Sequence, residues 1–243
     1  MKRITSYIRK AVEDYQMIEE GDRVAVGISG GKDSLALLGG MALLSRYYPK
    51  KFTVIGLTLD MGAKADYSGI RRYCESFGVE YHVKETNIRE IIFDIRKEPN
   101  PCALCAKMRR GALNDFAKEM GCKKVALGHH NDDVIETFFL SLLYEGRVNC
   151  FSPVTHLDRS GIYQIRPMIY VPEREVRGVA RRLELPVMKS SCPVDGETKR
   201  QYIKELIHRL DEETTPGLKK RLFTAIQNGK LDGWKKEDSR KGM

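Results

Sequence analysis

The chain of 243 residues lacks long apolar runs: no stretch of eighteen apolar residues, the length a membrane helix needs, occurs in it. Its first ten residues, MKRITSYIRK, are charged and contain neither the apolar core nor the cleavage site of a signal peptide. Internal repeats and low-complexity linkers are also missing. We therefore expect a cytoplasmic protein without membrane association, large enough for one large domain or for a domain with a small appendage.

Acidic residues are too few to balance the basic ones, and the formal net charge is +9. This excess favours a polyanionic partner such as a nucleic acid, although solvated helix faces would explain it as well. Residues 196–243 hold 12 Lys or Arg against 8 Asp or Glu, a surplus of 4. A second basic group occupies the middle of the chain, at Arg96, Lys97, Lys107, Arg109 and Arg110.

Short β-branched runs alternate with amphipathic stretches, which predicts βαβ units, a parallel sheet and an α/β fold. We expect strands over residues 23–28, 52–59, 79–84, 125–127 and 163–166. We expect helices over residues 2–18, 35–47, 67–77, 101–120, 132–144, 172–185, 196–211 and 215–228.

Three of these strands end in polar or glycine-rich segments. The first leads into Ser29–Ser34, the second into Asp60–Gly62, and the fourth into Gly128–Asp133. Because ligands of parallel α/β sheets bind beyond the carboxyl ends of the strands, we expect the three segments to form one site.

The loop Ser29–Ser34 reads Ser-Gly-Gly-Lys-Asp-Ser and stands between a strand and a helix, an arrangement that suits phosphate binding. It is not a Walker A loop, since only three residues separate Gly27 from Gly31 and Asp33 follows Lys32. It also fails the Rossmann pattern, because Ser29 stands at the second glycine position. Asp33 has two open roles, as a metal ligand or as a helix cap.

The Ser29–Ser34 loop resembles the S-G-G-x-D-S signature of the PP-loop ATP pyrophosphatases, and Gly128–Asp133 resembles their second signature. This resemblance implies an α/β/α sandwich of the adenine nucleotide alpha hydrolase type, cleavage of ATP to AMP and pyrophosphate, and Mg²⁺ held by carboxylates. Asp132 and Asp133 are candidate Mg²⁺ ligands, although either could instead cap the following helix.

Six cysteines are present, and a reducing cytosol argues against disulfides among them. Cys102 and Cys105 form a C-x-x-C pair at a helix start, where the helix dipole favours thiolates. Cys192 lies beside a proline in a loop, which recurs in iron–sulfur ligation. The others, expected to be small buried residues, are Cys74, Cys122 and Cys150.

Taken together, Met17–Ser34, Cys102–Gly111, Ala126–Asp133, Ile165–Pro167 and Cys192 resemble the tRNA 2-thiocytidine synthetase family. The resemblance implies a [4Fe–4S] cluster on Cys102, Cys105 and Cys192, and replacement of an adenylated pyrimidine oxygen by sulfur. The family usually has another cysteine where this chain has Asp195, which could approach the cluster or cap the next helix.

The resemblance also assigns roles to residues and partners. It implies tRNA as substrate, a cysteine desulfurase or free sulfide as sulfur donor, and a possible homodimer. The residues implied in catalysis are Lys32, Asp33, Arg109 and Asp133. Those implied in binding ATP are Ser29, Gly30, Gly31, Lys32, Asp33, Ser34, Leu59, Asp60, Gly128 and Asp132.

We divide the chain into an N-terminal helix (1–22), a PP-loop domain with a C-x-x-C insertion (23–190) and a C-terminal helical segment with Cys192 (191–243). Alternative functions stay open at this level. They are sulfur transfer to a small molecule or another RNA base, a lysidine-synthetase-like ligase, and an ATP sensor without catalysis. The cysteines argue against the ligase, which needs no cluster.

Overall fold

The computed structural model describes residues 1–62, 65–96, 101–189, 199–229 and 231–235, and within them one six-stranded sheet. The strand order is β3-β2-β1-β4-β6-β5, and neighbours pair in parallel except β5, which runs antiparallel to β6. The strands are β1 (Asp22–Gly27), β2 (Phe52–Asp60), β3 (Glu80–Glu85), β4 (Lys124–Ala126), β5 (Val154–Leu157) and β6 (Ile162–Ile165).

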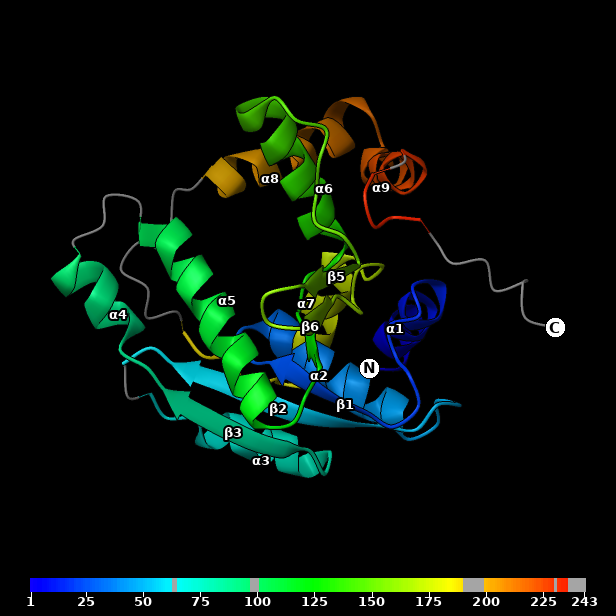
Figure 1. The fold of residues 1–243 in the computed structure, drawn as a ribbon. Coiled ribbons are helices and arrows are strands. Elements are labelled where there is room, and N and C mark those ends of the chain that lie inside the picture. Colours follow the sequence, from blue (N-terminus) through cyan, green and yellow to red (C-terminus); the bar gives the residue numbers. More distant parts are fainter. Residues whose placement is uncertain (63–64, 97–100, 190–198, 230, 236–243) are drawn as a thin grey trace.

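The helices connect and cover this sheet (Figure 1). They are α1 (Lys2–Asp14), α2 (Lys32–Ser45), α3 (Ser68–Ser76), α4 (Ile88–Glu90), α5 (Pro101–Glu119), α6 (Asn131–Leu140), α7 (Glu173–Arg182), α8 (Lys199–Arg209) and α9 (Leu218–Asn228). π-helical turns extend three of them, namely η1 (Ile91–Ile95), η2 (Ser141–Glu145) and η3 (Leu210–Thr214). None of the described helices is long and apolar enough to span a bilayer.

Helices lie on both faces of the sheet, with α5 above it and α3 below it in the view of Figure 1. A small core beneath α5 joins Phe116 and Ala117 to strand residues such as Ile55 and Val125. The larger core lies on the α2 side, where α1 packs on α2 through its buried face of Ile4, Ile8 and Val12. The predicted parallel-sheet α/β/α sandwich with extra terminal helices is confirmed.

The position of β1 and β4 decides where the site lies. They are adjacent and parallel, but the chain leaves β1 toward β2 on one side and arrives at β4 from β3 through α5. Such a reversal of strand order opens a crevice beyond the carboxyl ends of the two strands. The helices α6, α8 and α9 pack together beyond that edge (Figure 1).

Three local features differ from the sequence-based expectation. The edge strand β5 and the helical segment over residues 88–95 were not predicted, because both are too short to show a clear periodicity. Pro172 precedes α7 as its extended N-cap residue, with φ −66° and ψ 142°, and is therefore not the first helical residue. The predicted division at residues 22 and 190 stays a prediction.

Candidate functional site

The loop Ser29–Ser34 turns sharply from β1 into α2. Gly30 has φ +81°, a left-handed conformation that glycine adopts without strain. The helix begins at Lys32 after the extended residue Gly31, and no side chain among the described residues caps this end. Backbone N–H groups of the first turn therefore point out of the loop with the positive end of the helix dipole, as an anion site requires.

The serine hydroxyls brace the loop from within. The buried Ser34 hydroxyl donates to the Gly31 carbonyl at 2.9 Å and accepts the Ser29 backbone N–H at 3.2 Å. The Ser29 and Ser34 hydroxyl oxygens are 3.3 Å apart. The loop is thus held in its open shape by its own residues.

Charged side chains surround the loop. Lys32 Nζ lies 3.0 Å from the carboxylate of Asp33 and 3.4 Å from that of Glu173 at the start of α7. Burial lowers the pKa of Lys32, but the two carboxylates outweigh it and raise that pKa above its ordinary value. Asp33 is the second residue of α2 and makes no capping hydrogen bond, so its capping alternative is excluded.

Gly128 brings the second motif against this loop. A Cβ atom on Gly128 would lie 3.0 Å from the Ser34 nitrogen and 3.1 Å from the carbonyl carbon of Asp33. Both neighbours are backbone atoms of α2, which cannot turn aside as a side chain can. Only glycine therefore allows the end of β4 to approach the start of α2 so closely.

His130 and Asp133 form a capping box at the start of α6. The His130 backbone N–H donates to the Asp133 carboxylate at 2.9 Å, and His130 Nδ1 accepts the Asp133 N–H at 3.4 Å. His130 Nε2 then lies 3.7 Å from Asp33 Oδ1. The imidazole therefore links Asp33 of the first motif to Asp133 of the second.

Asp132 has different partners. It is buried, and its carboxylate accepts the Glu173 backbone N–H at 2.7 Å and a hydrogen bond from Lys219 of α9 at 3.0 Å. Neither partner belongs to the Ser29–Ser34 loop. Asp132 thus ties the second motif to α7 and α9, whereas the Asp133 carboxylate lies 3.4 Å from the His130 ring that Asp33 also approaches.

Sequence reasoning missed Glu173, which connects several of these groups. Its buried carboxylate contacts Lys204 of α8 at 2.9 Å and Arg177 at 3.0 Å, besides Lys32. Burial alone would raise the pKa of Glu173, but the hydrogen bonds from Lys204 and Arg177 hold it at about 2. The only local signal was its place after Pro172, because Lys32 and Lys204 are remote in sequence.

A second unpredicted group lies at the ends of β4 and β6. The centroid of the Phe151 ring lies 4.9 Å from the centroid of the His129 ring and 5.0 Å from the Arg166 guanidinium carbon. His129 Nδ1 and Arg166 Nε are buried without partners among the described residues. Burial, and then the charge of Arg166, lowers the pKa of His129 to about 4. His129 is therefore neutral at pH 7 and supplies no charge for phosphate binding.

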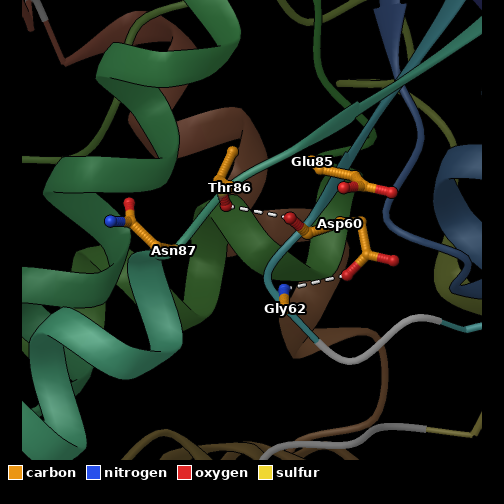
Figure 2. A pocket seen from close by; sticks show the side chains of 5 residues that line it. All are labelled: Asp60, Gly62, Glu85, Thr86 and Asn87. Atoms are coloured by element: carbon orange, nitrogen blue, oxygen red, sulfur yellow. Dashed lines mark hydrogen bonds between the residues drawn. The ribbon is translucent and has the colours of Figure 1, made fainter.

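Asp60 lies at the carboxyl end of β2, beside a pocket of about 390 Å³ that Asp60, Gly62, Glu85, Thr86 and Asn87 line (Figure 2). The Asp60 carboxylate accepts the Gly62 N–H at 2.9 Å, and its carbonyl accepts the Thr86 hydroxyl at 2.9 Å. Leu59 points to the α5 side and packs against the small core there. The pocket is acidic and suits hydroxyl and amino donors better than phosphates.

Cys102 and Cys105 lie in the first turn of α5, where residues three apart share one face of the helix. Cys102 is exposed and Cys105 half-buried. Cys192 and Asp195 lie outside the described residues. Arg109, exposed on the same helix, is one turn beyond Cys105, and no described contact joins it to the loop.

The other cysteines are buried, as predicted. Burial raises the pKa of Cys74 to about 12 and that of Cys150 to about 11, and it also raises the pKa of Cys122. Such thiols stay protonated at neutral pH and make poor metal ligands. Within the described ranges, no three His, Cys, Asp or Glu side chains are grouped closely enough to hold a metal ion.

Comparison with known proteins gives consistent relatives. The PP-loop domain family matches residues 2–210. The tRNA-cytidine(32) 2-sulfurtransferase of Citrifermentans bemidjiense is 37% identical over 231 residues, with 93% of this chain and 90% of that protein covered. The enzyme of the same name from Pelobacter propionicus is 38% identical over 232 residues, with 93% of this chain and 86% of that protein covered.

Solved structures agree with these relatives. A U34-tRNA thiolase from Methanococcus maripaludis, solved with its [4Fe–4S] cluster, has a TM-score of 0.76 at 25% identity, covering 93% of this chain and 77% of that one. An NH3-dependent NAD synthetase from Campylobacter jejuni shares the fold, with a TM-score of 0.50 at 18% identity, covering 93% of this chain and 91% of that one. The resemblance read from the motifs is confirmed, and the chain belongs to the PP-loop family and, within it, to the family of the tRNA-cytidine(32) 2-sulfurtransferases.

Proposed function

We propose that this protein is an ATP- and iron–sulfur-dependent tRNA sulfurtransferase, which replaces the carbonyl oxygen of a pyrimidine, cytidine 32, with sulfur. One observation carries the proposal: the loop Ser29–Ser34 and the segment Gly128–Asp133 meet at the β1–β4 crevice. They do so in a chain that matches tRNA-cytidine(32) 2-sulfurtransferases along 93% of its length.

The proposed ATP site has three parts. The N–H groups of Ser29–Ser34 and the Lys32 ammonium bind the β- and γ-phosphates, as the dipole and charge of this corner favour. Asp33 and Asp133, joined through His130, offer the carboxylate oxygens that Mg²⁺ prefers. The acidic pocket beside Asp60 accepts the adenosine hydroxyl and amino groups. Asp132 holds the start of α7 beside this site by accepting a hydrogen bond from the Glu173 N–H.

During the reaction, Lys32, the loop and Arg109 stabilise the negative charge that develops on the leaving groups. The base carbonyl oxygen attacks the α-phosphorus, a new P–O bond forms, and the bond to pyrophosphate breaks. Lys32 and the loop N–H groups stabilise the negative charge that pyrophosphate gains. The adenylated oxygen is a good leaving group. Sulfide therefore attacks the carbon of the former carbonyl group, a C–S bond forms, the C–O bond breaks, and AMP departs. In this scheme Arg109 steadies the departing AMP or an RNA phosphate.

The cysteine chemistry fits an iron–sulfur cluster. Two thiols in the first turn of α5 face one side, near the positive end of the helix dipole, and are more accessible than the three buried cysteines. We assign Cys102, Cys105 and Cys192 as its three ligands. When bound, the cluster supplies an iron site at which sulfide can be held next to the activated base.

The partners follow from this chemistry. The substrate is tRNA, and the sulfur comes from a cysteine desulfurase or from free sulfide. A cytoplasmic location and a homodimer are part of the same proposal.

The test uses protein reconstituted anaerobically with iron and sulfide. Incubation with ATP, Mg²⁺, sulfide and unmodified tRNA should yield AMP, pyrophosphate and a thiocytidine that mass spectrometry places at position 32. In a parallel reaction with lysine in place of sulfide, a lysine-containing cytidine would point instead to a ligase. No tRNA product in either reaction would contradict the proposal. Cys105→Ala should abolish the visible absorbance of the cluster, whereas Cys122→Ala should retain it.

A further inference from the structure

A continuous stretch of exposed residues follows the end of α6. Residues 142–149 are all exposed, between buried Ser141 and buried Cys150. Large apolar side chains recur in it, with exposed fractions of 42% for Leu142, 54% for Leu143, 46% for Tyr144 and 65% for Val148. Four exposed large apolar side chains within seven residues are an unusual concentration on a protein surface and suggest a site of interaction.

Residues 142–145 of this stretch continue the helix that begins at the candidate active site. Asp133 is in the first turn of α6, and η2 continues that helix to Glu145. Tyr144 is eleven residues beyond Asp133, so the two lie roughly 16 Å apart along the helix axis. One macromolecule of modest size can therefore reach both.

Helix α8 packs beside α6 and adds a second aromatic and a cation (Figure 1). Lys199 Nζ lies 4.6 Å from the centroid of the Tyr144 ring. Tyr202, 53% exposed, is three residues beyond Lys199 and thus on the same face of α8. We call Leu142, Leu143, Tyr144, Arg147, Val148, Lys199 and Tyr202 the η2–α8 patch.

The η2–α8 patch has a net positive charge. Arg147 and Lys199 form no ion pair with a carboxylate of the described residues, and the one exposed carboxylate within residues 142–149, Glu145, accepts a hydrogen bond from the Ser141 hydroxyl at 3.0 Å. A second copy placed on this surface about a twofold axis would bring like charges together. A polyanion meets a net positive charge instead, from Arg147 and Lys199 against Glu145.

We propose that the η2–α8 patch docks the single-stranded loop of the substrate RNA. Tyr144 and Tyr202 stack on unpaired bases, and Arg147 and Lys199 contact the phosphates between them, which is how proteins hold unstacked RNA. The apolar side chains of Leu143 and Val148 pack against base and ribose edges. This inference rests on the proposed function, since it names the surface by which the same reaction holds its tRNA.

The test measures binding of an unmodified tRNA transcript to the reconstituted protein by fluorescence anisotropy. Tyr144→Ala should weaken binding about five- to hundredfold, the range for loss of one stacked base. Arg147→Gln and Lys199→Gln should each weaken it and lower the slope of log affinity against log salt by about 1.

The chain offers matched controls at the opposite edge of the sheet. Tyr47, 54% exposed after α2, and Lys118, exposed near the end of α5, are of the same residue types. Tyr47→Ala and Lys118→Gln should leave tRNA affinity unchanged. Binding of a non-hydrolysable ATP analogue should be unchanged in all five variants, which shows that each is folded.

The possible outcomes separate this inference from the function itself. Equal tRNA affinity in Tyr144→Ala and Tyr47→Ala would overturn the docking surface while leaving the thiolation reaction in place. Sedimentation in which Tyr144→Ala turns a dimer into a monomer at unchanged tRNA affinity would assign the patch to a second copy. A wild-type protein that binds no tRNA and forms no thionucleoside would remove both proposals.

Discussion

The substitution Gly128→Ala adds one methyl group where the segment Gly128–Asp133 closely approaches the loop Ser29–Ser34. The added methyl group would lie 3.0 Å from the Ser34 nitrogen, 3.1 Å from the Asp33 carbonyl carbon and 3.2 Å from the Asp33 oxygen. Ordinary contact for a Cβ begins near 3.4 Å, so β4 and the start of α2 must separate by a few tenths of an ångström. Overpacking of this kind costs about 1–3 kcal/mol of folding stability.

The same displacement acts on ATP binding. It moves the first-turn N–H groups of α2 and the Asp33 carboxylate away from their positions in the proposed ATP site. We expect affinity for a non-hydrolysable ATP analogue, measured by titration calorimetry, to fall by about tenfold, or ~1.4 kcal/mol. Chemical denaturation measured in parallel reports the stability.

Gly178→Ala is the matched control. Gly178 lies inside α7, and a Cβ there meets no atom within 4 Å. This substitution should stabilise the protein by up to about 1 kcal/mol, through the helix propensity of alanine, without changing analogue affinity. If Gly128→Ala folds and binds the analogue as tightly as the wild type, the contact does not shape the proposed ATP site and the reasoning is refuted.

Two further predictions follow from the pKa values. Because the pKa of Glu173 falls from its ordinary value to about 2 on folding, its charge contributes roughly 3 kcal/mol above pH 5, and this is lost as the pH falls through 2. Urea denaturation of Glu173→Gln should thus show a deficit at pH 7 that shrinks toward pH 3. Glu175→Gln, on the same helix, removes only an ion pair with the exposed Arg3 and should cost less than about 1 kcal/mol at pH 7. A pH-independent deficit in Glu173→Gln would contradict the assignment. Iodoacetamide at pH 8 should label exposed Cys102 of the cluster-free protein well before Cys74, whose buried thiol has a pKa of about 12, as peptide mapping can verify. Equal labelling rates would show that Cys74 is accessible.

The sequence predicted the parts of the site that local pattern controls. Alternating strands and helices indicated a parallel sheet, and the carboxyl ends of β1, β2 and β4 then had to lie at one edge. The Ser-Gly-Gly-Lys-Asp-Ser loop was recognisable because its glycines and charges are contiguous. Both the sandwich and the meeting of the two motifs followed from these signals.

The rest depends on contacts between residues far apart in the chain. The bond from Lys219 to Asp132 spans 87 residues, and that from Lys204 to Glu173 spans 31, so no local pattern announces either. Periodicity equally failed for β5, because a four-residue edge strand with no fully buried residue shows no alternation. Which of the two aspartates shares the His130 ring with Asp33 also needed the structure, since only the capping box distinguishes them.

The ionic links around Glu173 and Asp132 bear on how this protein can be divided. Helices α8 and α9 supply Lys204 and Lys219 to carboxylates that also contact Lys32 and the second motif. A fragment ending after α7 would lose both cations together with the helices that cover these carboxylates, leaving Glu173 with Lys32 and Arg177 and leaving Asp132 with the Glu173 N–H. The C-terminal helices therefore help to fix the carboxylates of Glu173 and Asp132, and exchanging these helices between relatives would require the matching carboxylates to move with them.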